Sequence, residues 1–451
     1  MKRDMTTGKE MKLILLFTLP IMAGNLLQQL YNIVDGIIVG NFVSDSAFAS
    51  VATCYPLVML YLSMSIGLSV GVGIIIAQYY GAGKNDKLPV AIDTALVLLG
   101  ICGLALTVFG VLFSDTLLRN LLSVPEDILP NAVIYLRIYS VGLFFTFLYN
   151  SIAAILRGFG DSKATLYFLL IAALLSTALT FVFVLVIKWG VAGAAFSTVL
   201  AQAVCAIVSY TYLRRRFPYE KRGSHWDGEI AATMVKLGLP VAIQMSIVSF
   251  GSGAMQRLVN GFESTVPGVV AAFGAAYRLD MLVLVPIMGF QSGLSSFTGQ
   301  NMGAGKIDRV KRGLRVTLAM SVVTTVAVSL ILFVFARYIV AFFGLHDDSL
   351  VIGISIIRFL TLVFWFFAVY QTVNGLLQGA GDTMVVSTAT LTALFVRVFL
   401  SYLSVRMGWL GPEAAWLTNP LGWAFALAIT LTRYFTGGWK KKAVAGKFKR
   451  G

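Results

Sequence analysis

An aspartate in the first apolar segment is the side chain best suited to chemistry in this sequence. Asp35 lies in the C-terminal part of an apolar run at 13–39. Tyr31 and Gln28 precede it by four and seven residues, so a helix places all three side chains on one face. A carboxylate at membrane depth is costly and usually functional, and burial favours its protonated form. We therefore predict that Asp35 binds and releases a proton. The alternative is an aspartate that is permanently paired and only locks helices together.

The second half of the chain carries further charges within apolar segments. Arg278 and Asp280 are two residues apart, roughly 200° around a helix, so they do not simply pair with each other. Asp280 either pairs with Arg397 from a neighbouring helix, or one of these charges faces a cavity and contacts substrate or relays protons. Methionine and aromatic side chains suit promiscuous binding, although ordinary helix packing is the alternative for each. The candidate substrate surface comprises Tyr277, Arg278, Asp280, Arg397, Met255 and Met281.

Cysteine and histidine usage indicates neither a disulfide framework nor a metal centre. Three cysteines lie in apolar segments without close spacing, and two histidines fall in predicted loops. These residues are Cys54, Cys102, Cys205, His225 and His346. We expect no metal site, and no cofactor beyond a coupling ion, H⁺ or Na⁺.

Composition places these residues in a membrane protein. Of 451 residues, 58% are hydrophobic and only 12% are charged, with a mean hydropathy of +0.84. Soluble domains carry roughly 25% charged residues, so lipid must cover most of this surface. The net charge of +15 then belongs to loops rather than to a nucleic-acid-binding face. Disorder is excluded by the hydrophobic content.

Twelve segments are long and apolar enough to cross a bilayer as helices, which needs about 20 residues each. The fold class predicted is an all-α membrane protein. The expected spans are 13–39, 46–79, 89–113, 131–156, 164–187, 191–213, 233–260, 267–300, 313–336, 352–378, 384–405 and 412–435.

Basic residues set the expected orientation. With the N-terminus inside, the cytoplasmic segments hold 26 Lys and Arg residues and the outside loops hold 4. The positive-inside rule then predicts a multi-pass protein of the plasma (inner) membrane with both termini cytoplasmic. The first apolar run lacks a small-residue cleavage pattern, so we expect it to remain as a helix.

The sequence repeats itself at an offset of 220 to 222 residues. QYYGAGK at 78–84 returns as QNMGAGK at 300–306, and LRGFGD at 156–161 returns as LQGAGD at 377–382. Each copy contains six predicted helices, an even number, so both copies enter the membrane in the same direction. Such parallel repeats occur in secondary transporters. We predict an N-terminal lobe at 1–213, a basic cytoplasmic linker at 214–232 and a C-terminal lobe with a basic tail at 233–451.

The GAGK sequences are not phosphate-binding loops. A P-loop needs Ser or Thr after its lysine and a preceding strand, whereas Asn85 and Ile307 follow the two lysines here. We interpret both as turns in which glycine reverses the chain. With no ATPase domain, transport energy must come from an ion gradient.

Taken together, the chain resembles a multidrug and toxic compound extrusion (MATE) transporter of the prokaryotic type. The resemblance rests on QQLYNIVDGIIVG at 28–40, the paired GAGK and G-x-GD loops, and VAGAAFST at 191–198, and it covers nearly the whole sequence. It implies two six-helix lobes around a central cavity. It also implies export of amphipathic compounds in exchange for protons or sodium.

The resemblance also implies a cation site in the N-terminal lobe. Gln28, Tyr31 and Asp35 match the family motif that holds the cation-binding carboxylate, and Asn150 and Thr198 match further ligands. Where the family often has N-x-x-x-D in the fifth helix, this chain has Ser176 and Thr180. Hard cations favour charged oxygens, so the missing second carboxylate favours proton over sodium coupling.

A proline near the middle of the first helix is a candidate hinge. Pro20 removes a backbone hydrogen bond and permits a bend. In the MATE family, which this chain resembles, bending of the first helix is associated with the carboxylate site. Pro240, at the symmetric position, supports a fixed bend as the alternative.

These observations predict an antiporter that works by alternating access and is not an enzyme. Its expected partners are the bilayer and a small amphipathic organic substrate, with no nucleic acid, and we expect a monomer. A lipid-linked glycan or lipid flippase of a related two-lobe family is the alternative, favoured by Arg278 and Arg397 and opposed by Asp35.

Overall fold

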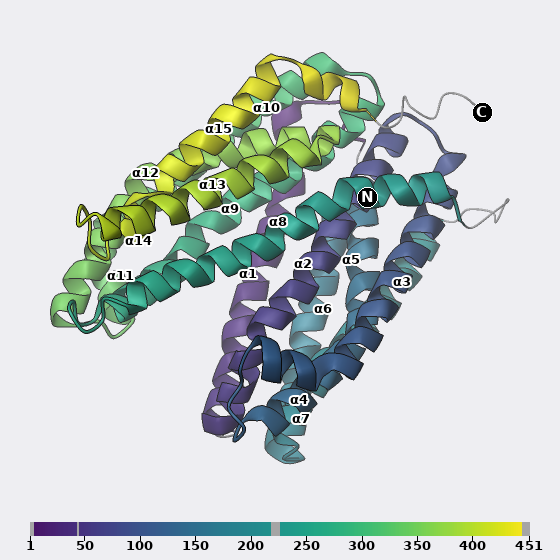
Figure 1. The fold of residues 1–451 in the computed structure, drawn as a ribbon. Helices are drawn as coiled ribbons and strands as arrows, with labels where there is room; N and C mark the ends of the chain where they lie inside the picture. The colour runs from purple at the N-terminus through teal and green to yellow at the C-terminus, as the bar shows by residue number, and fades with distance from the viewer. Residues whose placement is uncertain (1–3, 43–44, 218–225, 444–451) are drawn as a thin grey trace. The chain divides into compact units, whose positions relative to one another are not determined.

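The computed structural model describes residues 4–42, 45–217 and 226–443, except for the side chains of 30–42 and 45–48. Within these ranges the chain forms helices and no strand. Contacts between residues divide it into two units (Figure 1). Unit 1 comprises Met1–Asp4 and Leu19–Ser246, and unit 2 comprises Met5–Thr18 and Ile247–Gly451.

The first half of the chain supplies most of unit 1. Its helices are α1 (Glu10–Phe42), α2 (Asp45–Gly81), α3 (Lys87–Thr116), η1 (Leu117–Leu121), α4 (Leu129–Val141), α5 (Leu143–Gly158), α6 (Ser162–Thr180), η2 (Phe181–Val186) and α7 (Gly190–Arg216). Within the unit α2 packs on α5, α5 on α3 and α7, and α6 on α7. One part of its core, between α2, α3 and α4, includes Cys54, Tyr61 and Leu136.

The second half supplies most of unit 2. Its helices are α8 (Gly228–Asn260), α9 (Val269–Gly303), α10 (Ile307–Val334), α11 (Ala336–Phe342), α12 (Asp347–Ala380), α13 (Thr383–Arg406), α14 (Ala414–Leu417), α15 (Asn419–Phe435) and η3 (Gly438–Lys442). The helices α9 and α12 lie side by side, and α13 packs on α15 (Figure 1). The core between α8, α9 and α12 includes Phe273, Ile356 and Phe364.

The prediction of twelve spans in an all-helical fold is confirmed. Eleven helical segments of the described chain are long and apolar enough to cross a membrane, and the bent pair α4 and α5, which meet at 43°, makes twelve when it is counted as one span. The span expected at 131–156 is therefore broken at Gly142 rather than continuous.

The expected linker at 214–232 overlaps the helices on either side of it. The helix α7 continues to Arg216, and α8 begins at Gly228. Residues 218–225, with His225, lie outside the described residues.

The repeated sequence motifs end helices in the same way in both units. Gly83 and Gly305 have φ values of +67° and +72°, a left-handed conformation that glycine adopts without strain. The following lysine amides reach back to the carbonyls of Tyr79 and Asn301, at 3.1 and 2.8 Å, as in a Schellman cap. The interpretation of the GAGK sequences as turns after helices is thereby confirmed.

The helices α1 and α8 each change unit along their length. The first residues of α1 belong to unit 2, where Thr18 lies so close to Gly293 of α9 that a Cβ there would overlap its hydroxyl. The first part of α8 belongs to unit 1, where Ala242 lies against Gly67 of α2 just as closely. Small residues let helix backbones approach in this way, which gains packing contacts in a bilayer.

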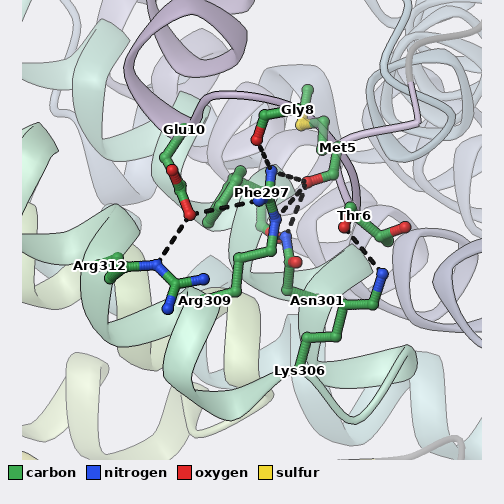
Figure 2. A network of polar contacts seen from close by, with 9 residues as sticks. All are labelled: Met5, Thr6, Gly8, Glu10, Phe297, Asn301, Lys306, Arg309 and Arg312. Atoms are coloured by element: carbon green, nitrogen blue, oxygen red, sulfur yellow. Dashed lines mark hydrogen bonds and ion pairs between the residues drawn. The ribbon is translucent and has the colours of Figure 1, made fainter.

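A short strap, Asp4–Lys9, precedes α1 and is held by unit 2 (Figure 2). The wholly buried Met5 donates its amide to Gln300 Oε1 at 2.8 Å and accepts from Asn301 Nδ2 at 3.1 Å. Lys306 donates to the carbonyl of Thr6 at 2.9 Å. Three residues of the QNMGAGK motif therefore bind the strap, a role that the sequence did not reveal.

Arginines of α10 complete this attachment (Figure 2). Arg309 donates to the carbonyl of Gly8 at 2.7 Å and pairs with Glu10 at 3.2 Å, while its guanidinium lies over the ring of Phe297. Arg312 pairs with the same carboxylate at 3.0 Å. Charge-assisted hydrogen bonds are the stronger kind, so these contacts anchor the start of α1 to unit 2.

We predict that Arg309→Ala releases the strap. Amide hydrogen exchange of the peptide that contains Asp4–Glu10 should become about tenfold faster, because such bonds are worth about 1.5–3 kcal/mol each. Lys311→Ala is the matched control in the same helix, since Lys311 pairs only with the exposed Asp308 among the described contacts. Unchanged exchange in Arg309→Ala, or equal acceleration in the control, would contradict this attachment.

Glu263 holds the start of α9. It lies in the loop between α8 and α9, and its carboxylate accepts from the amides of Gly268 and Val270 at 2.9 Å each. These two bonds to the helix N-terminus hold the pKa of Glu263 below its usual value of 4.5.

This lowered pKa makes the contribution of Glu263 to stability dependent on pH. It is present in full above about pH 4.5 and is lost as the pH falls through the lower folded value. We therefore expect Glu263→Gln to lower the thermal unfolding midpoint at neutral pH, with the deficit shrinking in acid. Wild-type and variant midpoints in detergent from pH 3 to 7 measure this, and a deficit independent of pH would contradict it.

Candidate functional site

The helix α1 contains the three residues that are predicted to share one face, among them Asp35 with its carboxylate. It is a single helix from Glu10 to Phe42 and runs through Pro20 without a break, so Gln28, Tyr31 and Asp35 do share a face. Gln28 is exposed, whereas the side chains of Tyr31 and Asp35 lie outside the described part of the structure. The proton-binding role of Asp35 therefore stays a prediction.

The side chain of Asn150 in α5 forms a hydrogen bond with a neighbouring helix. Its Nδ2 donates to Oγ of the fully buried Ser65 on α2, at 2.9 Å. Sequence reasoning did not single out Ser65, because a lone serine in an apolar helix is an ordinary residue. The amide oxygen of Asn150 is the atom that this bond leaves to accept from, or coordinate, another group.

The remaining predicted ligands lie on two helices that pack together. Ser176 and Thr180 of α6 are 3% and 0% exposed, and the Thr198 hydroxyl on α7 donates to the carbonyl of Ala194 at 3.3 Å. The helices α5, α6 and α7 contain no carboxylate. A cation bound by these three helices would therefore contact hydroxyl, amide and carbonyl oxygens. Asp35 of α1 is the one carboxylate that the sequence motif assigns to the site.

In unit 2 Asp280 and Arg397 interact electrostatically. The carboxylate on α9 and the guanidinium on α13 attract each other, and the Tyr277 side chain also acts on the guanidinium. Arg397 gains one long hydrogen bond to the carbonyl of Ala415, at 3.4 Å, while its buried Nε has no partner among the described residues. Arg278 is exposed. An electrostatic attraction of this kind is consistent with the pairing of Asp280 and Arg397, which stays a prediction.

The two methionines proposed for a substrate surface differ in burial. Met255 is 1% exposed and packs in the core with Leu258 and Phe273, so the packing alternative holds for it. Met281 is half-buried and Tyr277 is 48% exposed. Across the residues that the structure describes, no three His, Cys, Asp or Glu side chains come together as a metal site.

A family model described as MatE matches residues 20–182 and again 240–403. The chain belongs to the MatE family. The two matched ranges start 220 residues apart, in register with the internal repeat. MatE proteins are multidrug-type membrane transporters rather than enzymes, and the resemblance drawn from the sequence motifs is confirmed.

Curated relatives match the MatE chain along nearly its whole length. The probable multidrug resistance protein YpnP of Bacillus subtilis (strain 168) is 30% identical over 440 residues, covering 97% of each chain. A second protein of that organism, the probable multidrug resistance protein YoeA, is 28% identical and covers 95% of this chain and 94% of its own length. The solved structure of an outward-facing multidrug resistance MATE family transporter superposes with a TM-score of 0.87 at 24% identity, covering 98% of this chain and 99% of that one.

We predict that the Asp280 and Arg397 side chains stabilise each other in the MatE fold. Asp280→Asn leaves the Arg397 cation without its electrostatic partner and should lower the free energy of unfolding by about 3–5 kcal/mol. Adding Arg397→Gln should restore part of the loss. Thermal unfolding in detergent measures the stability of both variants. Arg278→Gln, which changes an exposed neighbour, is the control, and its free energy of unfolding should stay within about 0.5 kcal/mol of wild type. A double variant less stable than Asp280→Asn would contradict the pairing.

Proposed function

We propose that this protein is a secondary active antiporter that exports amphipathic, multidrug-type compounds by alternating access. Proton influx through Asp35 drives the export. The proposal rests on membership of the MatE family, on relatives described as probable multidrug resistance proteins, and on the carboxylate face of α1.

The division of α1 between the two units carries this proposal. The strap from Met5 onward and the first turns of α1 belong to unit 2. The helix changes unit between Thr18 and Leu19, and Pro20 follows at once. Asp35 lies farther along the same continuous helix, in unit 1. Protonation at Asp35 therefore acts on a helix whose start is anchored in the other unit, and Pro20 is the hinge at which it bends.

The oxygen ligands of unit 1 favour protons as the coupling ion. Sodium, a hard cation, is held best by several charged or carbonyl oxygens, whereas α5, α6 and α7 offer no carboxylate beside Asp35. A single carboxylate with Tyr31, Gln28, Asn150, Ser176, Thr180 and Thr198 around it suits a proton, whose binding needs only one acceptor and hydrogen-bonding neighbours.

The wider architecture follows from the repeat and the charge pattern. We propose lobes at 1–213 and 233–451, joined by a short basic linker, in a monomer of the inner membrane with both termini cytoplasmic. Tyr277, Arg278, Asp280, Arg397 and Met281 remain the proposed substrate surface of the C-terminal lobe. Met255 is omitted because it lies in the core.

The coupling role of Asp35 is tested in proteoliposomes with an imposed proton gradient and no sodium. Export of a fluorescent lipophilic cation such as ethidium should fall at least about tenfold in Asp35→Asn, because the amide cannot take up the proton. Asp115→Asn is the matched control, since Asp115 lies exposed at the end of α3 and pairs with Arg119.

Two results would overturn the proposal. One is proton-driven export at the wild-type rate by a folded Asp35→Asn protein. The other is a strict sodium requirement in the wild type when the two gradients are imposed separately. A monodisperse elution profile and an unchanged unfolding midpoint establish that the variant is folded.

A lipid-linked glycan or lipid flippase is the second candidate function. The exposed Arg278 and the weakly hydrogen-bonded Arg397 favour it, since basic side chains would suit a diphosphate head group. Competition between cationic dyes and a lipid-linked sugar diphosphate for the purified protein separates the two. Tight, arginine-dependent binding of the sugar lipid with no dye binding would favour the flippase.

A further inference from the structure

A groove of about 820 Å³ lies between the C-terminal ends of α8 and α13 in unit 2. Its wall is formed by apolar and aromatic side chains, including Phe262, Phe395 and Phe399, which are joined by the guanidinium groups of Arg257 and Arg406. The Tyr402 hydroxyl, also in the wall, donates to the Ala254 carbonyl at 3.0 Å. This bond holds α13 against α8 beside the groove. The volume is in the range of sites that hold small organic molecules.

The groove lies at the depth of a membrane interface. Arg257 is in the last turn of α8 and Arg406 is in the last turn of α13. The exposed indole of Trp409 follows three residues after Arg406, and Tyr402 is 41% exposed. Aromatic residues of this kind gather where lipid head groups begin. The two arginines therefore lie at head-group level, and the phenylalanines extend toward the hydrocarbon.

The acidic side chains nearest to these arginines in sequence, Glu263 and Glu413, bind backbone amides instead. Glu263 directs its carboxylate to the amides of Gly268 and Val270, at 2.9 Å each. Glu413 directs its carboxylate to the amide of Gly411, at 2.8 Å. Neither Arg257 nor Arg406 has an ion pair or side-chain hydrogen bond among the residues that the structure describes. An anion in the groove would give these guanidinium groups a partner that the described residues do not supply.

We propose that this groove binds one anionic phospholipid. The phosphate lies between Arg257 and Arg406, where guanidinium groups favour phosphate oxygens, and an acyl chain lies along Phe395 and Phe399. Basic pockets between membrane helices recognise anionic head groups by the same chemistry. The site is independent of the carboxylate on α1. In the internal repeat the positions matching Arg257 and Arg406 are Ile37 and Leu185, so unit 1 does not duplicate it.

Native mass spectrometry of the purified, delipidated full-length protein tests the proposal. The protein is titrated with phosphatidylglycerol, with phosphatidylcholine of the same acyl chains, and with inorganic phosphate. We expect one phosphatidylglycerol to bind at least about tenfold more tightly than phosphatidylcholine, because only its head group carries a net charge. Inorganic phosphate at the same concentration should not displace it, since it lacks the acyl chain.

Variants assign this binding to the groove. Arg257→Gln with Arg406→Gln should abolish the preference for phosphatidylglycerol, and Phe399→Ala should weaken both lipids alike. Arg337→Gln, an exposed arginine of α11 outside the groove, is the matched control and should bind as wild type. An unchanged unfolding midpoint establishes that each variant is folded.

Several outcomes would overturn the proposal. Equal retention of the two lipids would show only annular lipid, and an unchanged preference in the double arginine variant would place the lipid elsewhere. Displacement by inorganic phosphate would show a simple anion site without acyl recognition. Competition between ethidium and the lipid, lost in the double variant, would instead assign the groove to the substrate path.

Discussion

The close approach of small residues to the first halves of α1 and α8 is the constraint on which the structure depends. Gly293 lets Thr18 of α1 reach the α9 backbone in unit 2, and Gly67 lets Ala242 of α8 reach α2 in unit 1. Because apolar side chains gain little from leaving lipid, such van der Waals contact is what holds membrane helices together. Each unit thus includes the start of a helix whose remainder belongs to the other.

The strap extends this arrangement with polar contacts at the end of unit 2. Asn301, Lys306 and Arg309 direct most of their donors at main-chain carbonyls of the strap, so the contact depends on backbone geometry rather than on strap side chains. The QNMGAGK motif, which ends α9 with a left-handed glycine, therefore also binds the strap before α1. The same turn geometry reverses the chain in both repeats, and in unit 2 the residues around it also hold the strap.

Charged residues within the spans divide into different physical roles. Asp280 on α9 and Arg397 on α13 carry opposite charges that attract each other within unit 2. Arg257 and Arg406 avoid the cost of burial by lying in the last turns of their helices, at head-group depth. The side chain of Asp35 lies outside the described part of the structure, and the proposed function gives this carboxylate a third role, the binding and release of a proton.

The sequence by itself determined the membrane class, the twelve spans, the repeat, the helix-ending turns and the family. These follow from local composition, and a bilayer permits few other backbone structures for such apolar segments. Only the tertiary structure decided which partner each polar group has: Ser65 for Asn150, and Arg309 for the carbonyl of Gly8. It also decided that Met255 is a core residue, that 131–156 is broken at Gly142, and that α1 and α8 are shared between units. Those outcomes depend on which helices meet at which faces. Spacing along one helix predicts a shared face, but it carries no information about the helix that will cover it.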